Sequence, residues 1–511
     1  MKLHLLLTSD IHGYLAPTNY IHQTFNEPFS LERAATYIKQ QQTKDQYTLT
    51  FDDGDYLEGS PLAANAANQY NAPKPIDQAF NAIRYDYGIV GNHKFNFGIQ
   101  YLKNSIRESK RQFLCANITD ENDNLVFGKP YAIKQVGPVK VGILGATTAG
   151  TPKWELPAHI KGLKFHSLVA TAKKYVPIMR KQADVIVVVY HGGFERDHNG
   201  KPTEILDGEN EGYQLLKEVP GIDALLTGHQ HRVIKDHLFG VPVMQVGCKG
   251  QYVGNITLDI QNQKVVKSNV HLEPMKGVKP DPALTKVVKP AEVATDNWLN
   301  QPLAKVQGNM DFKDPHQARI NGCAYDRFIQ KMQIQLTHAD ISANALFTDD
   351  SHGFPSPVTI RDIMVNYVYP NKLCLSVING KILKEAVEQS AKYFDYHDGK
   401  IVVSKAFSEP QPLQYLYDLY YGFDYVINVA KPIGHRVTKL TYHGKPVRPD
   451  QQFKMTMNNY RAVGGGFPMF NKHQIKWISK KGMPQIIAEY LKEHPVIKAD
   501  STHNMKVIYQ P

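Results

Sequence analysis

The first half of the chain alternates short apolar runs with longer amphipathic stretches. Most of the apolar runs end in a cluster of polar residues and glycine, as buried strands do. The runs with polar endings occupy residues 3–7, 47–51, 87–90, 185–190 and 224–226. A further run at 139–144 lacks such an ending, and the stretches at 31–41 and 166–182 are typical of helices. This alternation predicts a layered α/β domain.

The pattern changes near residue 275. Several prolines interrupt the chain there, and residues 283–300 then follow a helical pattern that Pro290 kinks or interrupts. Beyond this helix a second, mixed α+β domain is predicted by strand patterns at 374–378, 425–429 and 437–442 and by a helical pattern at 380–394. The length of 511 residues fits two or three domains. We therefore expect a first domain over 1–275, a connector with a hinge helix over 276–305 and a second domain over 306–511.

The composition is that of a folded protein with a net positive charge. Hydrophobic residues make up 42% of the chain and charged residues 21%, which supports buried cores and excludes overall disorder. Lysine and arginine number 59 against 48 acidic residues, a net charge of +11. A positive field favours phosphorylated metabolites, nucleic acid or acidic polymers as partners, although a basic surface that serves solubility fits equally well. The charge therefore leaves the partner open.

Cysteine usage and hydropathy narrow the class of protein further. The four cysteines, Cys115, Cys248, Cys323 and Cys374, show no CxxC spacing, which argues against a disulfide framework or a cysteine-built zinc site. No apolar run reaches the roughly 18 residues that span a bilayer. Residues 1–10 become polar too early for a signal peptide. We expect a cytoplasmic protein if the chain is complete, and an exported or cell-surface protein if a leader has been removed.

The polar clusters at the strand ends carry side chains that bind metals. They are Asp10, His12, Asp55, Asn92, His93, His191, His229 and His231. Carboxylate oxygen, amide oxygen and imidazole nitrogen are ligands of borderline divalent ions. The strand ends of an α/β sheet meet at the edge where loops build sites. Asp52 and Asp53 stand beside Asp55, so the chemistry leaves the choice of carboxylate open. A single histidine is more often structural, but the joint pattern favours a metal site.

The order of these motifs resembles a known family. D-I-H-G, G-D, G-N-H, H-G-G and G-H-Q-H resemble the motifs of calcineurin-like metallophosphoesterases, and most closely those of the two-domain 5′-nucleotidase family. The resemblance covers essentially the whole chain. The nucleoside-binding signature of that family is similar to residues 458–467, N-N-Y-R-A-V-G-G-G-F. Segments 415–418, 422–425 and 431–437 resemble parts of its substrate domain. The resemblance implies a four-layer α/β/β/α domain followed by an α+β substrate-binding domain.

The resemblance also implies a role for each site residue. One divalent ion would be held by Asp10, His12 and His231. The second would be held by Asn92, His191 and His229, with Asp55 as a bridge between the two ions. His93 matches the catalytic histidine, which stabilises negative charge on the phosphoryl group. The remaining matches concern the nucleoside: Tyr415 and Tyr460 would sandwich the base, and Asn344 would add a polar substrate contact.

Three positions depart from the pattern of 5′-nucleotidases. Asn96 replaces an aspartate that pairs with the catalytic histidine, and an amide can orient His93 but cannot stabilise its charged form as a carboxylate would. Together with segments 359–362 and 367–370, the N-F-G sequence from Asn96 resembles the 2′,3′-cyclic-nucleotide 2′-phosphodiesterase/3′-nucleotidase branch. Gly466 replaces an acidic residue near the ribose. Lys94 replaces a glutamate, at a position that we expect on the surface.

We therefore predict a metal-dependent phosphoric ester hydrolase, a 2′,3′-cyclic-nucleotide 2′-phosphodiesterase and 3′-nucleotidase. Water activated by two divalent ions (Mn, Zn, Co or Fe) would attack phosphorus in line, and the two domains would close about the connector by analogy with the family. The expected partners are 2′,3′-cyclic, 3′- or 5′-nucleotides, with no stable nucleic-acid partner. One alternative is a 5′-nucleotidase or nucleotide-sugar hydrolase on the same scaffold. An alternative of another class is a non-catalytic nucleic-acid-binding or scaffold protein.

Overall fold

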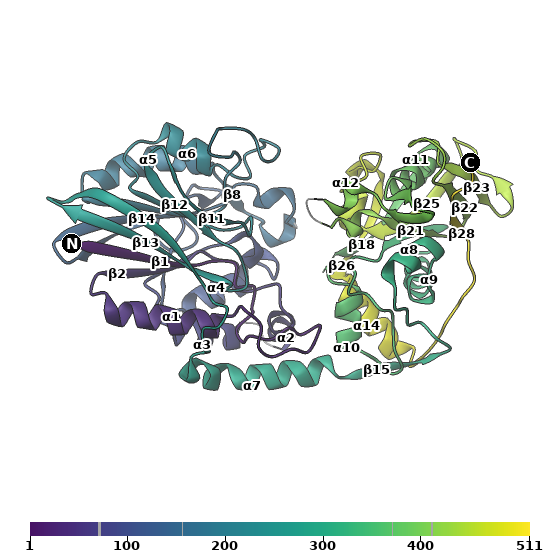
Figure 1. Cartoon of the computed structure of the whole chain (residues 1–511), viewed down its shortest axis with the longest axis horizontal. Coiled ribbons are helices and arrows are strands. Elements are labelled where there is room, and N and C mark those ends of the chain that lie inside the picture. The colour runs from purple at the N-terminus through teal and green to yellow at the C-terminus, as the bar shows by residue number, and fades with distance from the viewer. Residues whose placement is uncertain (70–72, 156, 370, 410–411) are drawn as a thin grey trace. The chain divides into compact units, whose positions relative to one another are not determined.

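The computed structural model describes residues 1–69, 73–155, 157–369, 371–409 and 412–511 (Figure 1). Pro370, the last residue of the segment 367–370 that resembles the cyclic-phosphodiesterase branch, lies outside the described residues. The chain divides into two compact units, Met1–Asn297 and Trp298–Pro511. Within the described part of the chain, no helix combines the length and the apolar character needed to cross a membrane.

The first unit contains two six-stranded sheets. One has the strand order β14 (Lys264–Pro274), β13 (Tyr252–Gln261), β1 (Lys2–Thr8), β2 (Thr48–Asp52), β3 (Tyr87–Ile89) and β4 (Gln112–Leu114). The other has the order β11 (Val233–Leu238), β12 (Val241–Val246), β10 (Ala224–Thr227), β9 (Val185–His191), β7 (Val139–Thr147) and β6 (Tyr131–Val136). A small antiparallel pair is formed by β5 (Ile118–Asp120) and β8 (Leu163–Phe165).

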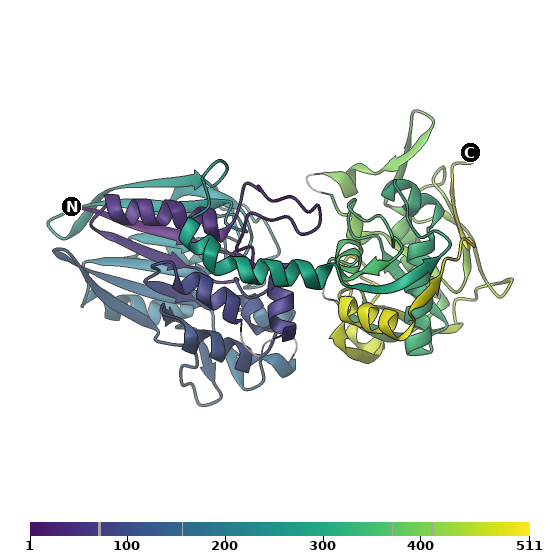
Figure 2. The ribbon, with the colours of Figure 1, turned by 90° about the horizontal axis from the view of Figure 1, so that it is seen from below.

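The two sheets pack face to face, and helices cover their outer faces (Figures 1 and 2). In β9, Val185, Val187 and Val189 enter the core between the sheets, whereas Ile186 and Val188 pack toward the helices. Because successive side chains of a strand point to opposite faces, a strand buried on both faces reads as one apolar run. The helices are α1 (Leu31–Lys44), α2 (Pro61–Gln69), α3 (Lys74–Asn81), α4 (Ile99–Glu108), α5 (Leu168–Arg180) and α6 (Gly212–Glu218). The predicted layered α/β domain is confirmed.

The direction of the strands explains where the polar clusters gather. Strands β1 to β4 are parallel, as are β7, β9, β10 and β12. Parallel strands end at a common edge, and the loops that follow them build sites there. The candidate metal ligands follow β1, β2, β3 and β10, and His191 is the last residue of β9. Helix α7 (Pro282–Leu299), which includes Pro290, continues from this unit as the long helix of Figure 2.

The second unit is a mixed α+β structure. Its largest sheet has the order β21 (Asp418–Tyr421), β16 (Ile341–Ala345), β25 (Gln452–Asn458), β18 (Lys372–Asn379) and β26 (Ile475–Gly482). One smaller sheet has the order β24 (Lys445–Pro446), β23 (Val437–Tyr442), β22 (Asp424–Asn428) and β28 (Met505–Ile508). Another has the order β17 (Val358–Thr359), β15 (Pro302–Gln307) and β27 (Val496–Lys498). Strands β19 (Phe394–His397) and β20 (Lys400–Val403) form a two-stranded sheet. The helices are α8 (Pro315–Asn321), α9 (Ala324–Thr337), α10 (Ile360–Asn366), α11 (Gly380–Ala391), α12 (Lys405–Ser408), α13 (Asn459–Ala462) and α14 (Met483–Glu493). The predicted α+β class is confirmed, and β18, β22, β23 and α11 coincide with the expected elements.

Candidate metal centre and nucleoside-binding surface

The backbone at the strand ends is strained in a way that aims side chains at one place. Left-handed φ angles of 48° to 69° occur at Asp10, His12, Asp55, His229 and His231. Such angles are uncommon outside glycine, and elsewhere in the chain they occur in turns such as the one at Asp398. Five predicted ligands therefore share an unusual conformation that short turns after the strands impose.

The first ligand group consists of Asp10, His12 and His231, whose ligand atoms all lie within 4.8 Å of one another. The two Nε2 atoms of His12 and His231 are 3.0 Å apart. Asp10 Oδ1 lies 3.4 Å from His231 Nε2 and 3.8 Å from His12 Nε2. One carboxylate oxygen and two imidazole nitrogens thus converge on a single point.

The second group consists of Asp55, His191 and His229. Asp55 Oδ2 lies 2.9 Å from His191 Nε2, and the Oδ1 atom of Asn92 lies 3.1 Å from the same nitrogen. A Cβ at Gly91 would stand 2.0 Å from Asp55 Oδ1, so only glycine allows this approach. The structure therefore places Asn92 with the second group, as expected, and it joins the two groups at His191, whose Nε2 is 4.0 Å from Asp10 Oδ1.

Both groups have the chemistry of a divalent cation site. Asp10 Oδ1 and Asp55 Oδ2 are buried and make no hydrogen bond within the described part of the chain. Burying a carboxylate oxygen without a hydrogen bond is costly, and a bound cation relieves that cost. Burial would raise the pKa of Asp55, but the imidazoles of His191 and His93 hold it well below its usual value. The carboxylate is therefore the anionic form that a metal requires.

The outward-facing nitrogens of the imidazoles are anchored. His12 Nδ1 donates a hydrogen bond of 2.8 Å to the carbonyl oxygen of Glu58, and His191 Nδ1 donates to the carbonyl oxygen of Asp53. His229 Nε2 lies 3.0 Å from Glu209 Oε1. Such partners fix the orientation of a ligating imidazole and strengthen it as a ligand. No sequence motif points to Glu209, because it stands in a polar loop.

Asp52 and Asp53 have other surroundings than Asp55. Asp52 Oδ2 makes a buried ion pair of 2.6 Å with Arg111, and neither Asp52 nor Asp53 belongs to a ligand group. Asp55, in contrast, also accepts a hydrogen bond of 2.9 Å from the backbone N–H of His93. The geometry therefore favours Asp55 among the three carboxylates that the sequence left open.

His93 lies beside the ligand groups without joining them. Its side chain is 39% exposed, and its ring centroid is 5.5 Å from that of His12. His93 Nδ1 is 2.8 Å from Asn96 Oδ1 and 3.3 Å from Glu58 Oε2. The hydrogen bond expected between Asn96 and His93 is therefore present, and Glu58 supplies a second acceptor near the same nitrogen.

The prediction that Lys94 lies on the surface is wrong. Its side chain is fully buried, and its Nζ lies 3.5 Å from the centre of the Tyr56 ring. The ammonium has no hydrogen-bond partner among the described residues. The Asp52–Arg111 ion pair lies in the same cluster, since the Arg111 guanidinium also packs on Tyr56. The aromatic ring and the nearby carboxylate of Asp52 explain why a lysine is accommodated here.

Replacing Lys94 with methionine is expected to stabilise the fold, most strongly at low pH. Burial lowers the pKa of Lys94 from 10.5 to about 7. The unfolded chain therefore binds more protons than the folded chain between those values, and wild-type stability rises with pH across that window. Methionine fills the space without a charge, so we expect a gain of about 1–3 kcal/mol at pH 6 that shrinks toward pH 10. Chemical denaturation at pH 6 and 9.5 measures it.

The exposed Lys103 of α4 provides the control, because Lys103→Met should leave the free energy of unfolding nearly unchanged at both pH values. A Lys94→Met variant that is less stable than wild type at pH 6 would show that the contact of the ammonium with the Tyr56 ring outweighs the cost of its burial.

In the second unit, the two predicted base-stacking residues come together. The ring centroids of Tyr415 and Tyr460 are 6.4 Å apart at an angle of 60°, and 43% of Tyr460 is exposed. The buried Arg461 connects the two segments, because it donates to Asp418 at 2.7 and 2.9 Å and to the carbonyl oxygen of Tyr415 at 2.8 Å. The two rings are tilted, so a base between them requires a rotation of at least one side chain.

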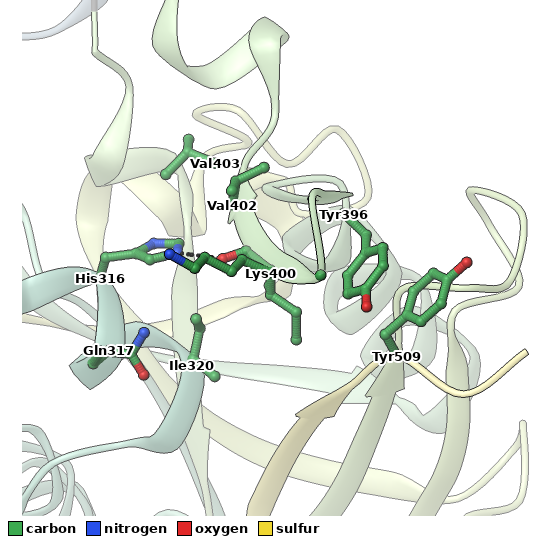
Figure 3. Close-up of a pocket in the computed structure, with 10 residues that line it drawn as sticks. His316, Gln317, Ile320, Tyr396, Lys400, Val402, Val403 and Tyr509 are labelled. Carbon is green, nitrogen blue, oxygen red and sulfur yellow. Dashed lines mark hydrogen bonds between the residues drawn. The ribbon is translucent and has the colours of Figure 1, made fainter.

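Asn344 belongs to a neighbouring strand, where it lies opposite Leu419 of β21. Its side chain is buried on β16 and donates a hydrogen bond of 2.8 Å to Asp326 Oδ1. This hydrogen bond gives Asn344 a structural contact, and the expected substrate contact stays a prediction. A separate pocket of about 650 Å³ lies between α8 and the β19–β20 hairpin, where the rings of Tyr396 and Tyr509 stack 3.6 Å apart (Figure 3). Neither Tyr415 nor Tyr460 lines it.

Comparisons with known proteins agree with these two units. Residues 3–233 match the calcineurin-like phosphoesterase family, and residues 303–472 match the 5′-nucleotidase C-terminal domain. The chain is 28% identical to a 2′,3′-cyclic-nucleotide 2′-phosphodiesterase/3′-nucleotidase of Haemophilus influenzae, over 96% of this chain and 84% of that protein. It is 29% identical to the protein of the same name from Salmonella typhimurium, over 96% and 86% of the two chains.

A solved structure is similar over the full length. The crystal structure of a putative 5′-nucleotidase from Staphylococcus aureus, in complex with α-ketoglutarate, superposes with a TM-score of 0.87 at 33% identity. The match covers 99% of this chain and 100% of the other. With the matches to both domain families and the paired ligand groups at the sheet edge, this similarity shows that the chain belongs to the two-domain 5′-nucleotidase family of calcineurin-like metallophosphoesterases, which are metal-dependent phosphoric ester hydrolases.

Proposed function

We propose that the chain is a dimetal hydrolase of nucleotide phosphoesters, with 2′,3′-cyclic-nucleotide 2′-phosphodiesterase and 3′-nucleotidase activity. The observation that carries this proposal is the pair of adjacent ligand groups, joined at His191 and flanked by His93. The names of the relatives from Haemophilus influenzae and Salmonella typhimurium support the choice of substrate.

Each ligand group would hold one divalent ion. Asp10, His12 and His231 would hold the first ion. The second would be held by Asn92, His191 and His229, with Asp55 shared between the two ions. When bound, the ions would polarise the phosphoryl oxygens and lower the pKa of water so that a nucleophile exists near neutral pH. The oxygen and nitrogen ligands fit Mn, Zn, Co or Fe.

The protein side chains would then stabilise the negative charge on the phosphoryl group and orient the substrate. His93, whose Nδ1–H is held by Asn96, would be doubly protonated when it meets the substrate, and its Nε2–H would then face a phosphoryl oxygen as negative charge develops there. Donors that are already oriented need no rearrangement during the reaction, which makes them more effective than water. We also propose that residues 1–275 form the catalytic domain, that 276–305 form the connector, and that 306–511 bind the nucleoside through Tyr415 and Tyr460.

The S. aureus relative, named as a putative 5′-nucleotidase, makes 5′-nucleotide hydrolysis the second candidate activity. Phosphate release from 3′-AMP and 5′-AMP, and ring opening of 2′,3′-cAMP followed by chromatography, distinguish the two. The protein is stripped with a chelator and reconstituted with Mn²⁺. We expect metal-dependent cleavage of 2′,3′-cAMP and 3′-AMP with little 5′-AMP hydrolysis. Hydrolysis of 5′-AMP alone would replace the proposed substrate, and no metal-dependent activity on any of the three would refute the proposed function.

Replacing Tyr460 with alanine is expected to raise KM for nucleotides and to spare small aryl phosphates. Stacking of a base on an aromatic ring contributes about 1–3 kcal/mol, which corresponds to a roughly 5- to 150-fold higher KM. An aryl phosphate without a nucleoside lacks most of this contact. Initial rates on 3′-AMP and p-nitrophenyl phosphate measure the difference. Equal losses on both substrates would indicate structural damage instead. The control variant is Tyr509→Ala, at another exposed tyrosine.

A further inference from the structure

A chain of hydrogen bonds leads from His93 away from the metal ligands to a buried carboxylate. His93 Nδ1 is 2.8 Å from Asn96 Oδ1, and Asn96 Nδ2 donates a bond of 2.9 Å to Glu155 Oε2. The other oxygen of Glu155 is 2.9 Å from His159 Nδ1. The Glu155 side chain is only 3% exposed. It follows the short helix at Thr151–Lys153, whereas Asn96 follows the one at Asn92–Phe95, so the contact joins distant parts of the first unit.

This arrangement removes an ambiguity that an asparagine would otherwise have. The amide of Asn96 has a donor end and an acceptor end of similar size, and either could face the imidazole. A carboxylate only accepts hydrogen bonds, so the NH₂ group must face Glu155. The carbonyl oxygen must then face His93 Nδ1, which carries the proton. The tautomer and the ring orientation of His93 are thereby fixed.

We propose that Glu155 is a positioning residue for the reaction, which acts on His93 through the amide of Asn96. The inference rests on the proposed function, since it presupposes that His93 meets the substrate. It explains how an amide at position 96 serves in this chain: a carboxylate on another segment reaches His93 through it, in addition to Glu58 beside Nδ1. Trp154, the neighbour of Glu155, stacks on the predicted ligand His229 at 6.0 Å, so the same stretch of chain also contacts the metal ligands.

Glu58 limits the expected size of the effect. Its Oε2 lies 3.3 Å from the same Nδ1 of His93 and remains when Glu155 is changed. Loss of Glu155 should therefore reduce turnover without abolishing it. Outer partners of this kind typically contribute a factor of about 10 to 100.

A reciprocal exchange of amide and carboxylate tests the proposal. In Asn96→Asp alone, two carboxylates would face each other at the present 2.9 Å contact, and in Glu155→Gln alone the Asn96 amide is free to turn over. We expect kcat on 3′-AMP to fall about 10- to 100-fold in each single variant, with KM nearly unchanged. In the double variant Asn96→Asp/Glu155→Gln, the carboxylate introduced at position 96 would accept from both His93 and the new amide. We expect kcat there to return to within about 3-fold of wild type, because the pairing is restored.

The exposed Glu218 of α6 is the matched control, since Glu218→Gln should change neither kcat nor metal content. Metal content and thermal stability are measured for all variants, and both should stay close to wild type. A double variant that is as slow as the worse single variant, with metal intact, would overturn the proposal. So would a Glu155→Gln variant with wild-type kcat.

A second readout separates this inference from the proposed function. In ¹⁵N-histidine-labelled protein, the imidazole nitrogen shifts report which nitrogen of His93 carries the proton, and a His93→Gln sample identifies the signal. We expect an Nδ1–H tautomer in wild type and in the double variant, and a mixture in Glu155→Gln. This result would uphold the positioning role even if no phosphoesterase activity were found. An unchanged tautomer in Glu155→Gln would count against it even in an active enzyme.

Discussion

Replacing Asp55 with asparagine is expected to eliminate measurable turnover and to lower the metal content. Asp55 is buried, its Oδ2 faces His191 Nε2 at 2.9 Å, and its Oδ1 accepts the backbone N–H of His93. Asparagine keeps the shape but removes the charge, and its NH₂ group would face either an imidazole nitrogen or an N–H donor. Because a Lewis-acid site supplies several kcal/mol of transition-state stabilisation, kcat should fall on the order of 10³-fold or more.

The measurement combines kcat on 3′-AMP with elemental analysis after desalting. Asp398→Asn provides a matched control, because Asp398 is exposed, has a left-handed φ of 51° and stands in a hairpin turn where asparagine is equally well tolerated. An Asp55→Asn protein with full metal content and normal turnover would show that the bridging assignment is incorrect.

The motifs predicted much of this site because the ligands follow strands that the sequence reveals. Valines in β9 alternate between two buried faces, so the strand appears as one apolar run, and His191 ends it. The strand order was not needed: parallel strands bring their ends to one edge. The spacing could not decide which of the three neighbouring carboxylates is the metal ligand. Asp52 is excluded by its ion pair with Arg111, a residue 59 positions away that no local pattern connects to it.

The residues that the sequence did not identify act through long-range contacts. Glu155 and Glu209 stand in loops without motifs, and their roles depend on Asn96 and His229, which other elements position. Lys94 shows the same limit in the core. Lysine is rarely buried. The place of Lys94 depends on the Tyr56 ring and the Asp52 carboxylate. Asp52 ends β2 and Tyr56 follows β2, whereas Lys94 follows β3. Hydrophobic patterns specify layers and edges, whereas such polar pairings require the folded geometry.

Replacing His93 with alanine is expected to lower kcat strongly while metal binding is kept. His93 belongs to neither ligand group and is 39% exposed, so its loss removes no ligand and leaves little buried space. Loss of one oriented donor to a developing oxyanion typically lowers kcat by about 10²–10³-fold. KM should change little, because the donor acts mainly on charge that develops in the transition state. Steady-state kinetics on 3′-AMP, together with elemental analysis, distinguish this variant from Asp55→Asn, which should lose both turnover and metal.

Chemical rescue gives the sharper test of what His93 does. The half-exposed position leaves room for imidazole from solution, which would restore part of kcat if His93 acts as a hydrogen-bond donor to the phosphoryl group. The exposed His435 serves as the control, since His435→Ala should keep wild-type kcat and show no response to imidazole. A His93→Ala protein that loses metal would instead make His93 a ligand. If His93→Ala keeps both metal and kcat, the two ligand groups alone stabilise the charge that develops on the phosphoryl group. Asn96 and Glu155 would then have no part in the reaction, because they act through His93.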